Sequence, residues 1–210
     1  WERNLDPELF IDRSLEGNVG GKIVLITGAS SGIGKSSALR LAEAGAHVLL
    51  VARSTDKLQE TAQEIAELGG MSTCYTADVS DLEDCDRLVS QVLADHGFID
   101  ILMNNAGRSI RRSLELSFDR FHDFERTMQI NYFGAVRLIM GFAPSMLKRQ
   151  QGQIINMSSI SALTPSPRFS AYVASKSALD AWTRAAAVEF SDRNVRFTTI
   201  NMPLVRTPMI

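Results

Sequence analysis

The sequence predicts a three-layer α/β fold in which a doubly wound parallel sheet lies between helices. Three observations predict it: short apolar segments alternate with segments of helical periodicity, a glycine turn joins the first apolar segment to the first helix, and a hydrophobic content of 45% suits a sizeable core. At 210 residues the chain favours one domain over two. Strands that alternate with helices run parallel through right-handed crossovers, so we expect ligands to bind at the carboxyl ends of the strands.

The expected elements follow one another without an internal repeat. The first strand, 24–27, leads through the glycine turn into a helix that ends at Gly45, because a residue without Cβ favours a helix cap. Further strands are expected at 47–52, 73–77, 101–104, 154–157 and 195–200, and further helices at 57–68, 81–96 (capped by Ser80 or Asp81), 119–149 and 171–190. Residues 1–20 are charged and weakly periodic, and we expect an arm or linker there before a domain at 21–210. The strand that usually completes such a sheet is expected to be missing from these residues.

Charge and cysteine content exclude several kinds of partner. A net charge of −2 provides no basic field for nucleic acid, and there is no long apolar run to span a membrane. A secretory leader is not visible, so we expect a cytoplasmic protein. Cys74 and Cys85 have no metal-binding spacing and are expected to be buried thiols, and His47, His96 and His122 are scattered. We therefore expect no metal site.

Gly28, Gly32 and Gly34 form the turn after the first strand. Glycines let the backbone approach a pyrophosphate, whose charge is met by the free N–H groups at the helix N-terminus. Their spacing, Gly-xxx-Gly-x-Gly, fits the common dinucleotide fingerprint only loosely. The turn favours a Rossmann-type nucleotide site, with a glycine turn that binds no ligand as the alternative.

Tyr172 and Lys176 are four residues apart and so lie on one face of the helix expected at 171–190. A free phenol has a pKa near 10, and lowering it to 7 requires about 4 kcal/mol of preferential stabilisation of the phenolate. A neighbouring ammonium group can provide that stabilisation. This pair therefore predicts a general acid, although the same spacing also occurs in solvated pairs without chemistry.

Several motifs occur together in one order along the chain. They are Thr27-Gly28-xxx-Gly32-x-Gly34, Asp78-Val79, Asn104-Asn105-Ala106-Gly107, Asn131, Ser158-Ser159, Tyr172-xxx-Lys176 and Pro203-x-Val205-x-Thr207. From Gly21 onward the chain resembles the short-chain dehydrogenase/reductase family. The resemblance implies hydride transfer between a nicotinamide cofactor and a carbonyl group.

The resemblance also implies a role for each of four catalytic residues. Tyr172 would donate the proton, while Lys176 would lower the pKa of Tyr172 and hold the ribose hydroxyls of the cofactor. Ser159, rather than its neighbour Ser158, would hydrogen-bond the carbonyl oxygen of the substrate, and Asn131 would anchor a water relay to Lys176. Donors placed in advance around that oxygen stabilise the negative charge that hydride attack creates.

Arg53 follows the second expected strand, where an acidic residue would bind an adenosine ribose and exclude a phosphate. An arginine suits a 2′-phosphate instead, and with no carboxylate expected to oppose it we predict NADP(H) rather than NAD(H). A solvated arginine is the alternative. Leu204 departs from the family, which usually has Gly after Pro203. The cofactor-binding residues implied are Gly28, Ser30, Ser31, Gly32, Ile33, Gly34, Arg53, Asp78, Val79, Asn105, Ala106, Gly107, Tyr172, Lys176, Val205 and Thr207.

Three segments, 104–113, 121–126 and 202–210, look like those of bacterial long-chain fatty acyl-CoA reductases. Such enzymes reduce an acyl thioester to a fatty aldehyde with NADPH, either as single-domain proteins or as the C-terminal half of a two-domain reductase. Arg108, Arg111 and Arg112 could pair with coenzyme A phosphates. A solvated loop with structural ion pairs is an equal alternative.

Two other functions remain open. A reductase of ketones, ketoacyl groups or other lipid carbonyls would use the same residues and stop at the alcohol, and an NADP-binding scaffold would have no turnover. The resemblance also implies a homodimer or homotetramer built from the helices that carry Asn131 and Tyr172. The residues that would allow close helix approach there are Ala135, Ile139, Ala178 and Ala185.

Overall fold

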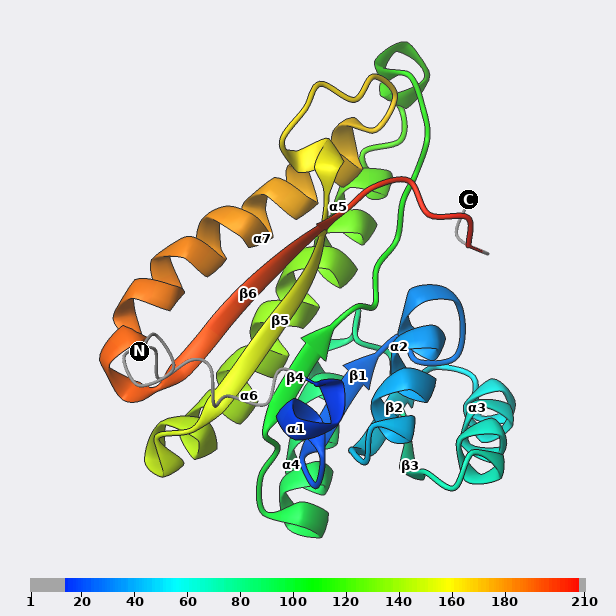
Figure 1. The fold of residues 1–210 in the computed structure, drawn as a ribbon. Coiled ribbons are helices and arrows are strands. Elements are labelled where there is room, and N and C mark those ends of the chain that lie inside the picture. The colour runs from blue at the N-terminus through cyan, green and yellow to red at the C-terminus, as the bar shows by residue number, and fades with distance from the viewer. Residues whose placement is uncertain (1–13, 208–210) are drawn as a thin grey trace, which may run out of the picture.

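Six parallel strands form one sheet in the order β3-β2-β1-β4-β5-β6 (Figure 1). The structure, a computed structural model, describes residues 14–207. The strands are β1 Ile23–Thr27, β2 His47–Ala52, β3 Met71–Thr76, β4 Ile101–Asn104, β5 Gly152–Ser159 and β6 Val195–Met202. The order reverses between β1 and β4, and such a switch point opens a crevice at the carboxyl ends of the strands.

The helices alternate with the strands, as βα units require. They are α1 Leu15–Val19, α2 Gly32–Glu43, α3 Thr55–Glu67, α4 Leu82–His96, α5 His122–Met128, α6 Gly134–Arg149 and α7 Ser170–Glu189. Short 3₁₀ turns lie at η3 Leu114–Ser117, η5 Ile160–Ala162 and η6 Ser191–Arg193, and a π turn, η4 Gln129–Phe133, joins α5 to α6. The three-layer α/β fold with a parallel sheet is thereby confirmed.

Two apolar clusters lie on the two faces of the sheet. On one face, strand residues such as Leu25 and Leu102 pack against Val92 of α4 and Phe142 of α6. Helices α2 and α3 cover β1, β2 and β3 on the other face. Because successive strand side chains point to opposite faces, the central strands β1 and β4 are buried on both sides.

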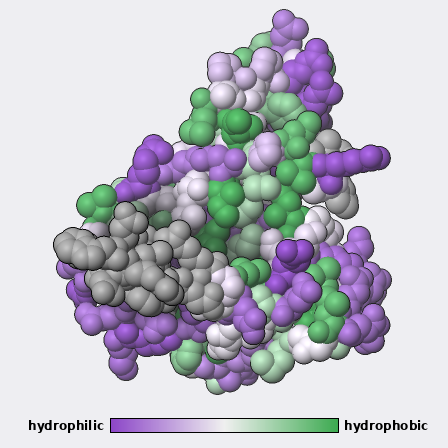
Figure 2. Space-filling view, in the orientation of Figure 1, coloured by the Kyte–Doolittle hydropathy of each residue, from purple (hydrophilic) through white to green (hydrophobic). Residues whose placement is uncertain are grey.

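Strands β5 and β6 are less covered on the α2 side of the sheet. Ile155 is only partly buried there and Ile200 is 36% exposed. Figure 2 shows hydrophobic side chains among polar ones on this face, which Figure 1 presents to the viewer without a described helix in front of β5 and β6. Within residues 14–207, β6 is the edge strand on this side of the sheet, and the expectation of a missing last strand stays a prediction.

Two segments differ from their expected form. The single helix expected at 119–149 begins at His122 and contains the π turn η4. Leu15–Val19, expected to belong to an arm, forms a helix that Ser14 caps, and Val19 packs into the core beside α2. Residues 1–13 of that expected arm lie outside the described residues.

Cys85 is buried, as expected, whereas Cys74 is only partly buried. Burial raises the pKa of each thiol. Within residues 14–207, no helix is both long enough and apolar enough to cross a membrane.

Candidate active site

The glycine turn joins β1 to α2 at the sheet's switch point. Gly28 has φ of +68°, a conformation that glycine adopts without strain. A Cβ on Gly34 would lie 2.2 Å from the carbonyl oxygen of Gly28, so only glycine lets helix and turn pack this closely. Ser31, the N-cap of α2, makes no side-chain capping bond, which leaves the first N–H groups of the helix available to an anion.

Thr27 and Asn105 join the carboxyl ends of β1 and β4. The hydroxyl of Thr27 accepts hydrogen bonds from the backbone N–H groups of Asn105 and Ala106, both at 3.0 Å. The side-chain amide of Asn105 donates to the carbonyl oxygen of Thr27 at 2.9 Å. These bonds place the expected cofactor residues 105–107 directly beside Gly28, where a Cβ would lie 3.0 Å from Ala106 Cα.

Arg53 lies at the carboxyl end of β2, with its side chain 73% exposed. Its Nη1 is 3.8 Å from Oδ2 of Asp78, so the expectation that no carboxylate opposes it is wrong. Asp78 also accepts hydrogen bonds through Oδ1 from the backbone N–H and the hydroxyl of Ser80. The parallel pairing of β2 with β3 causes this proximity, because it brings both strand ends to one edge. An anion that binds Arg53 would therefore have to compete with the Asp78 carboxylate for the guanidinium group.

Tyr172 and Lys176 lie near the N-terminus of α7. Lys176 is 4% exposed, and its Nζ donates a hydrogen bond of 2.6 Å to the carbonyl oxygen of Met157. Burial lowers the pKa of Lys176 to about 8, and the nearby Asp180 carboxylate opposes that change. Burial also raises the pKa of Tyr172, against a smaller lowering by the Ser159 hydroxyl. The expected lowering of the Tyr172 pKa by Lys176 is therefore not seen, since the Lys176 ammonium group is directed at the carbonyl oxygen of Met157.

Asn131 lies in the π turn and is 1% exposed. Its Oδ1 accepts from the backbone N–H of Arg108 at 2.8 Å, and its Nδ2 donates to the carbonyl oxygen of Arg108 and to Ser175 Oγ, each at 2.9 Å. The amide thereby ties the segment after β4 to α7. A Cβ on Gly107 would lie 2.9 Å from Asn131 Oδ1 and 3.6 Å from Lys176 Nζ, which places both side chains around this glycine.

The fold therefore brings the four expected catalytic residues to one place from three elements: Asn131 from η4, Ser159 from the end of β5, and Tyr172 and Lys176 from α7. Sequence reasoning missed two residues that hold members of this group in place, Met157 and Ser175. Met157 accepts a hydrogen bond from Lys176 through its carbonyl oxygen, and Ser175 accepts one from Asn131 through its hydroxyl group. Neither contribution has a sequence pattern of its own.

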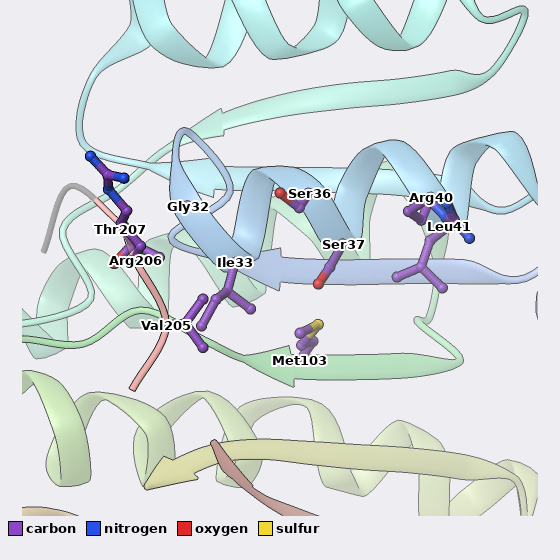
Figure 3. Close-up of a pocket in the computed structure, with 10 residues that line it drawn as sticks. All are labelled: Gly32, Ile33, Ser36, Ser37, Arg40, Leu41, Met103, Val205, Arg206 and Thr207. Carbon is purple, nitrogen blue, oxygen red and sulfur yellow. The ribbon is translucent and has the colours of Figure 1, made fainter. Parts of the chain in front are cut away.

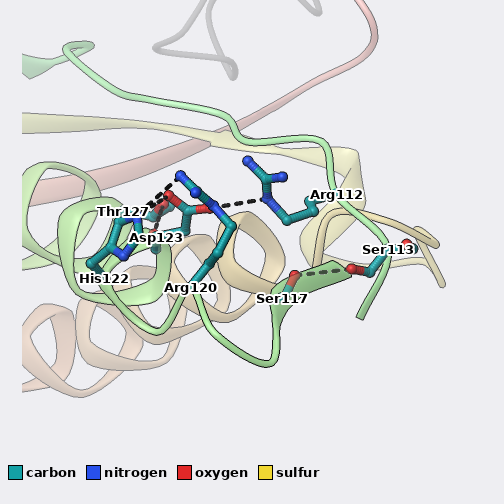
Figure 4. A network of polar contacts seen from close by, with 7 residues as sticks. All are labelled: Arg112, Ser113, Ser117, Arg120, His122, Asp123 and Thr127. Carbon is teal, nitrogen blue, oxygen red and sulfur yellow. Dashed lines mark hydrogen bonds and ion pairs between the residues drawn. The ribbon is translucent and has the colours of Figure 1, made fainter. Parts of the chain in front are cut away.

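The expected arginine cluster is only partly free. Figure 4 shows Arg112 and Arg120 converging on the buried Asp123, with Nε to Oδ2 distances of 3.1 and 3.3 Å. Arg108 and Arg111 have exposed side chains. For Arg112 the structural ion pair, one of the two alternatives open from the sequence, is the arrangement observed.

A pocket of about 520 Å³ lies beside α2, β4 and the segment after β6. Figure 3 shows Ile33 and Val205 beside each other there, with Thr207 nearby. None of Asn131, Ser159, Tyr172 and Lys176 lines it, so this pocket contains part of the expected cofactor residues and not the catalytic group. Among residues 14–207, no three His, Cys, Asp or Glu side chains gather closely enough to hold a metal ion.

The family model for short chain dehydrogenases matches residues 22–210. The chain belongs to the short-chain dehydrogenase family. The family is one of oxidoreductases, and the resemblance inferred from the motifs is confirmed.

Relatives with curated names include two fatty acyl-CoA reductases. The one from Acinetobacter baylyi is 56% identical over 193 residues, covering 92% of this chain and 65% of the relative. The one from Mycobacterium tuberculosis is 46% identical over 209 residues, covering 98% of this chain and 71% of the relative. An uncharacterized oxidoreductase of Mycobacterium bovis is 54% identical over 201 residues, covering 94% of this chain and 59% of that protein. The chain thus spans about two thirds or less of the length of the first and third of these.

Solved structures resemble the whole described fold. A metagenomic short-chain oxidoreductase in complex with NADP has a TM-score of 0.84 at 33% identity, over 90% of this chain and 85% of that one. L-Sorbose reductase from Gluconobacter frateurii, complexed with NADPH and L-sorbose, has a TM-score of 0.85 at 35% identity, over 90% of this chain and 72% of that one. An NAD⁺-bound xylitol dehydrogenase has a TM-score of 0.82 at 32% identity, over 88% of this chain and 70% of that one.

Proposed function

We propose that this chain is the reductase domain of a fatty acyl-CoA reductase that uses NADPH to convert an acyl thioester to a fatty aldehyde. The observation that carries the proposal is the gathering of Ser159, Tyr172, Lys176 and Asn131 beside the glycine turn. The two fatty acyl-CoA reductases, at 56% and 46% identity, support the substrate class. Binding of NADP or NADPH by structural neighbours supports the cofactor.

The residues present fit a dinucleotide. The α2 N-terminus offers backbone N–H groups to the pyrophosphate, and Arg53 is exposed where a 2′-phosphate would lie. Lys176 would hold the ribose hydroxyls through an Nζ that now donates to a backbone carbonyl group. Val205 and Thr207 would contact the carboxamide. NADPH, when bound, supplies the hydride.

The chemistry requires two donors at the carbonyl oxygen. As the hydride forms a C–H bond with the thioester carbon, the π electron pair of the C=O bond moves to oxygen, which Ser159 hydrogen-bonds and Tyr172 protonates. The hemithioacetal then collapses: the C–S bond breaks, its electron pair leaves with sulfur, and the hydroxyl proton passes to the thiolate. One acyl-CoA, one NADPH and one proton give one aldehyde, one free thiol of coenzyme A and NADP⁺.

Product analysis with NADPH tests this proposal. Saturated acyl-CoAs of several chain lengths should oxidise NADPH and release aldehyde and free thiol in equal amounts. A ketone reductase would instead oxidise NADPH with a 3-ketoacyl-CoA and release no thiol. A scaffold would bind NADPH without turnover of either substrate, and both of these results would contradict the proposal.

A further inference from the structure

A buried carboxyl group lies one helical turn beyond Lys176. Asp180 of α7 is 6% exposed, and its Oδ1 has no hydrogen-bond partner among the described residues. Ser158 on β5 is 4% exposed, and its hydroxyl also lacks a partner of good geometry there. A buried polar group without a hydrogen bond is costly, so a carboxyl group kept in such a place calls for a compensating interaction.

Lys176 is a buried cation on the same helix, four residues before Asp180. The spacing of four residues puts both side chains on one face of α7, against β5. Burial raises the pKa of Asp180, and the nearby Ser158 hydroxyl and the Lys176 ammonium group oppose that rise by favouring the carboxylate. Arg184, another turn along α7, contributes a weaker attraction and has an exposed side chain.

The other elements packed against α7 bring few charges to this place. Strand β5 contains no ionisable side chain. Helix α5 brings Asp123, which Arg112 and Arg120 already hold, and the partly buried His122. The other ionisable groups on these elements have exposed side chains: Glu125 and Arg126 of α5, Asp192 and Arg193 of η6, and Arg196 of β6. Asp180 is therefore the main counter-charge to Lys176 in this part of the chain.

We propose that Asp180 is a positioning residue that keeps Lys176 protonated, so that its ammonium group can hold the cofactor ribose. The proposal rests on the role proposed above for Lys176. Burial lowers the pKa of Lys176 to about 8, and Asp180 works against that lowering. Without the carboxylate the pKa would fall further, and a larger fraction of Lys176 would be neutral at neutral pH.

NADPH titrations from pH 6 to pH 9 test this role through binding alone. Affinity of the parent should decline as pH rises through about 8, where Lys176 loses its proton. In Asp180→Asn the decline should begin at least about one pH unit lower, with affinity at pH 6 nearly unchanged. Asp180→Glu keeps the charge and should restore most of the parent profile.

Thr183→Val is the matched control. Thr183 is also buried on α7 and hydrogen-bonds Asn156 and its own helix, so its loss costs packing and hydrogen bonds without removing a charge. The pH at which NADPH affinity declines in Thr183→Val should be the same as in the parent. Asp180→Ser, which leaves room for water, replaces Asp180→Asn if that variant does not fold. An unshifted midpoint in the folded charge-removing variant would overturn the proposal.

A second measurement needs no cofactor. Between the folded pKa of Lys176 and its unfolded value, the unfolded chain binds the extra proton, so Lys176 makes stability rise with pH in that window. Urea unfolding gives the free energy of unfolding of the parent and of Asp180→Asn at each pH, and the difference between the two isolates the effect of the carboxylate. The rise should begin at lower pH in the variant, and an identical onset would count against the role of Asp180. If NADPH failed to bind the parent, the proposed cofactor would be wrong, and this measurement would still decide the role of Asp180.

Discussion

Tyr172 lies half-buried in the first turn of α7, with the Ser159 hydroxyl beside it. Tyr172→Phe removes the proposed proton donor and keeps the ring. We expect turnover to fall by about 100-fold or more, the usual size of a general-acid contribution, with NADPH affinity nearly unchanged. Steady-state rates and a cofactor titration check both parts. Tyr132→Phe, on the neighbouring π turn, is the control, and a Tyr172 variant within a few-fold of the parent rate would disprove the assignment.

Arg53 is the residue expected to select NADPH over NADH through its positive charge. Arg53→Ala should weaken NADPH binding about tenfold, or about 1.4 kcal/mol, and leave NADH binding unchanged. The ion pair with Asp78 limits the effect, because the 2′-phosphate must draw the guanidinium group from that carboxylate. Arg87→Ala is a matched control, since Arg87 is 63% exposed and paired with Asp84. An equal loss of affinity for NADPH and NADH would show that Arg53 does not recognise the 2′-phosphate.

The sequence predicted the site residues that have chemistry of their own, and the fold brings Asn131, Tyr172 and Lys176 together. It did not predict how they are held. Asn131 uses its amide to tie the segment after β4 to α7, and Lys176 donates to a carbonyl group of β5. Such bonds depend on which strands are neighbours, and no local pattern contains that information. Asp180 was within reach of sequence reasoning, because it shares a helix face with Lys176.

At the scale of elements, the alternation of short apolar segments with segments of helical periodicity predicted the bounds of all six strands to within two residues at each end. The π turn between α5 and α6 could not be predicted, because apolar periodicity is too coarse to reveal one widened turn. The packing near it is tight: a Cβ on Gly134 would lie 1.9 Å from the carbonyl oxygen of Val79. Helix α1 was missed because five residues are too few to show a period.

The segment after β4 is fastened at Asp123. This carboxylate accepts hydrogen bonds from Arg112 and Arg120. The hydroxyl of Thr127 donates a hydrogen bond to the backbone carbonyl oxygen of Asp123. Burial disfavours the charge, but the two arginines outweigh it, and the pKa of Asp123 lies below its ordinary value. A lowered pKa means that the stabilisation is present above the unfolded pKa and is lost as pH falls through the folded one.

Asp123→Asn should therefore lower the thermal midpoint by a few degrees at pH 7 and have less effect near pH 3. Differential scanning calorimetry at both pH values provides the measurement. Asp86→Asn is the control, because Asp86 and Arg137 form an exposed ion pair that contributes little. An equal loss at both pH values would mean that the carboxylate charge is not what fastens the segment.

At the scale of the whole molecule, the expected dimer face needs a correction. Ala135 and Ile139 are 7% and 1% exposed, and Ile139 packs into the core cluster on this face of the sheet, so neither can form a surface between subunits. Phe133 of η4 and Met140 of α6 are instead 46% and 60% exposed. The sequence alone could not show which apolar residues of α6 the sheet would cover.

We expect a homodimer through the outer face of η4, α6 and α7, because large apolar side chains exposed together favour association. Met140→Glu would place a charge on that face and should convert the dimer to monomer at micromolar concentration, as measured by light scattering. Met71→Glu is the matched control, since Met71 is 58% exposed on β3, at the opposite edge of the sheet. A monomeric parent would refute the dimer itself. A dimer that survives Met140→Glu would move the interface elsewhere, and loss of the dimer in both variants would indicate a general effect of added charge.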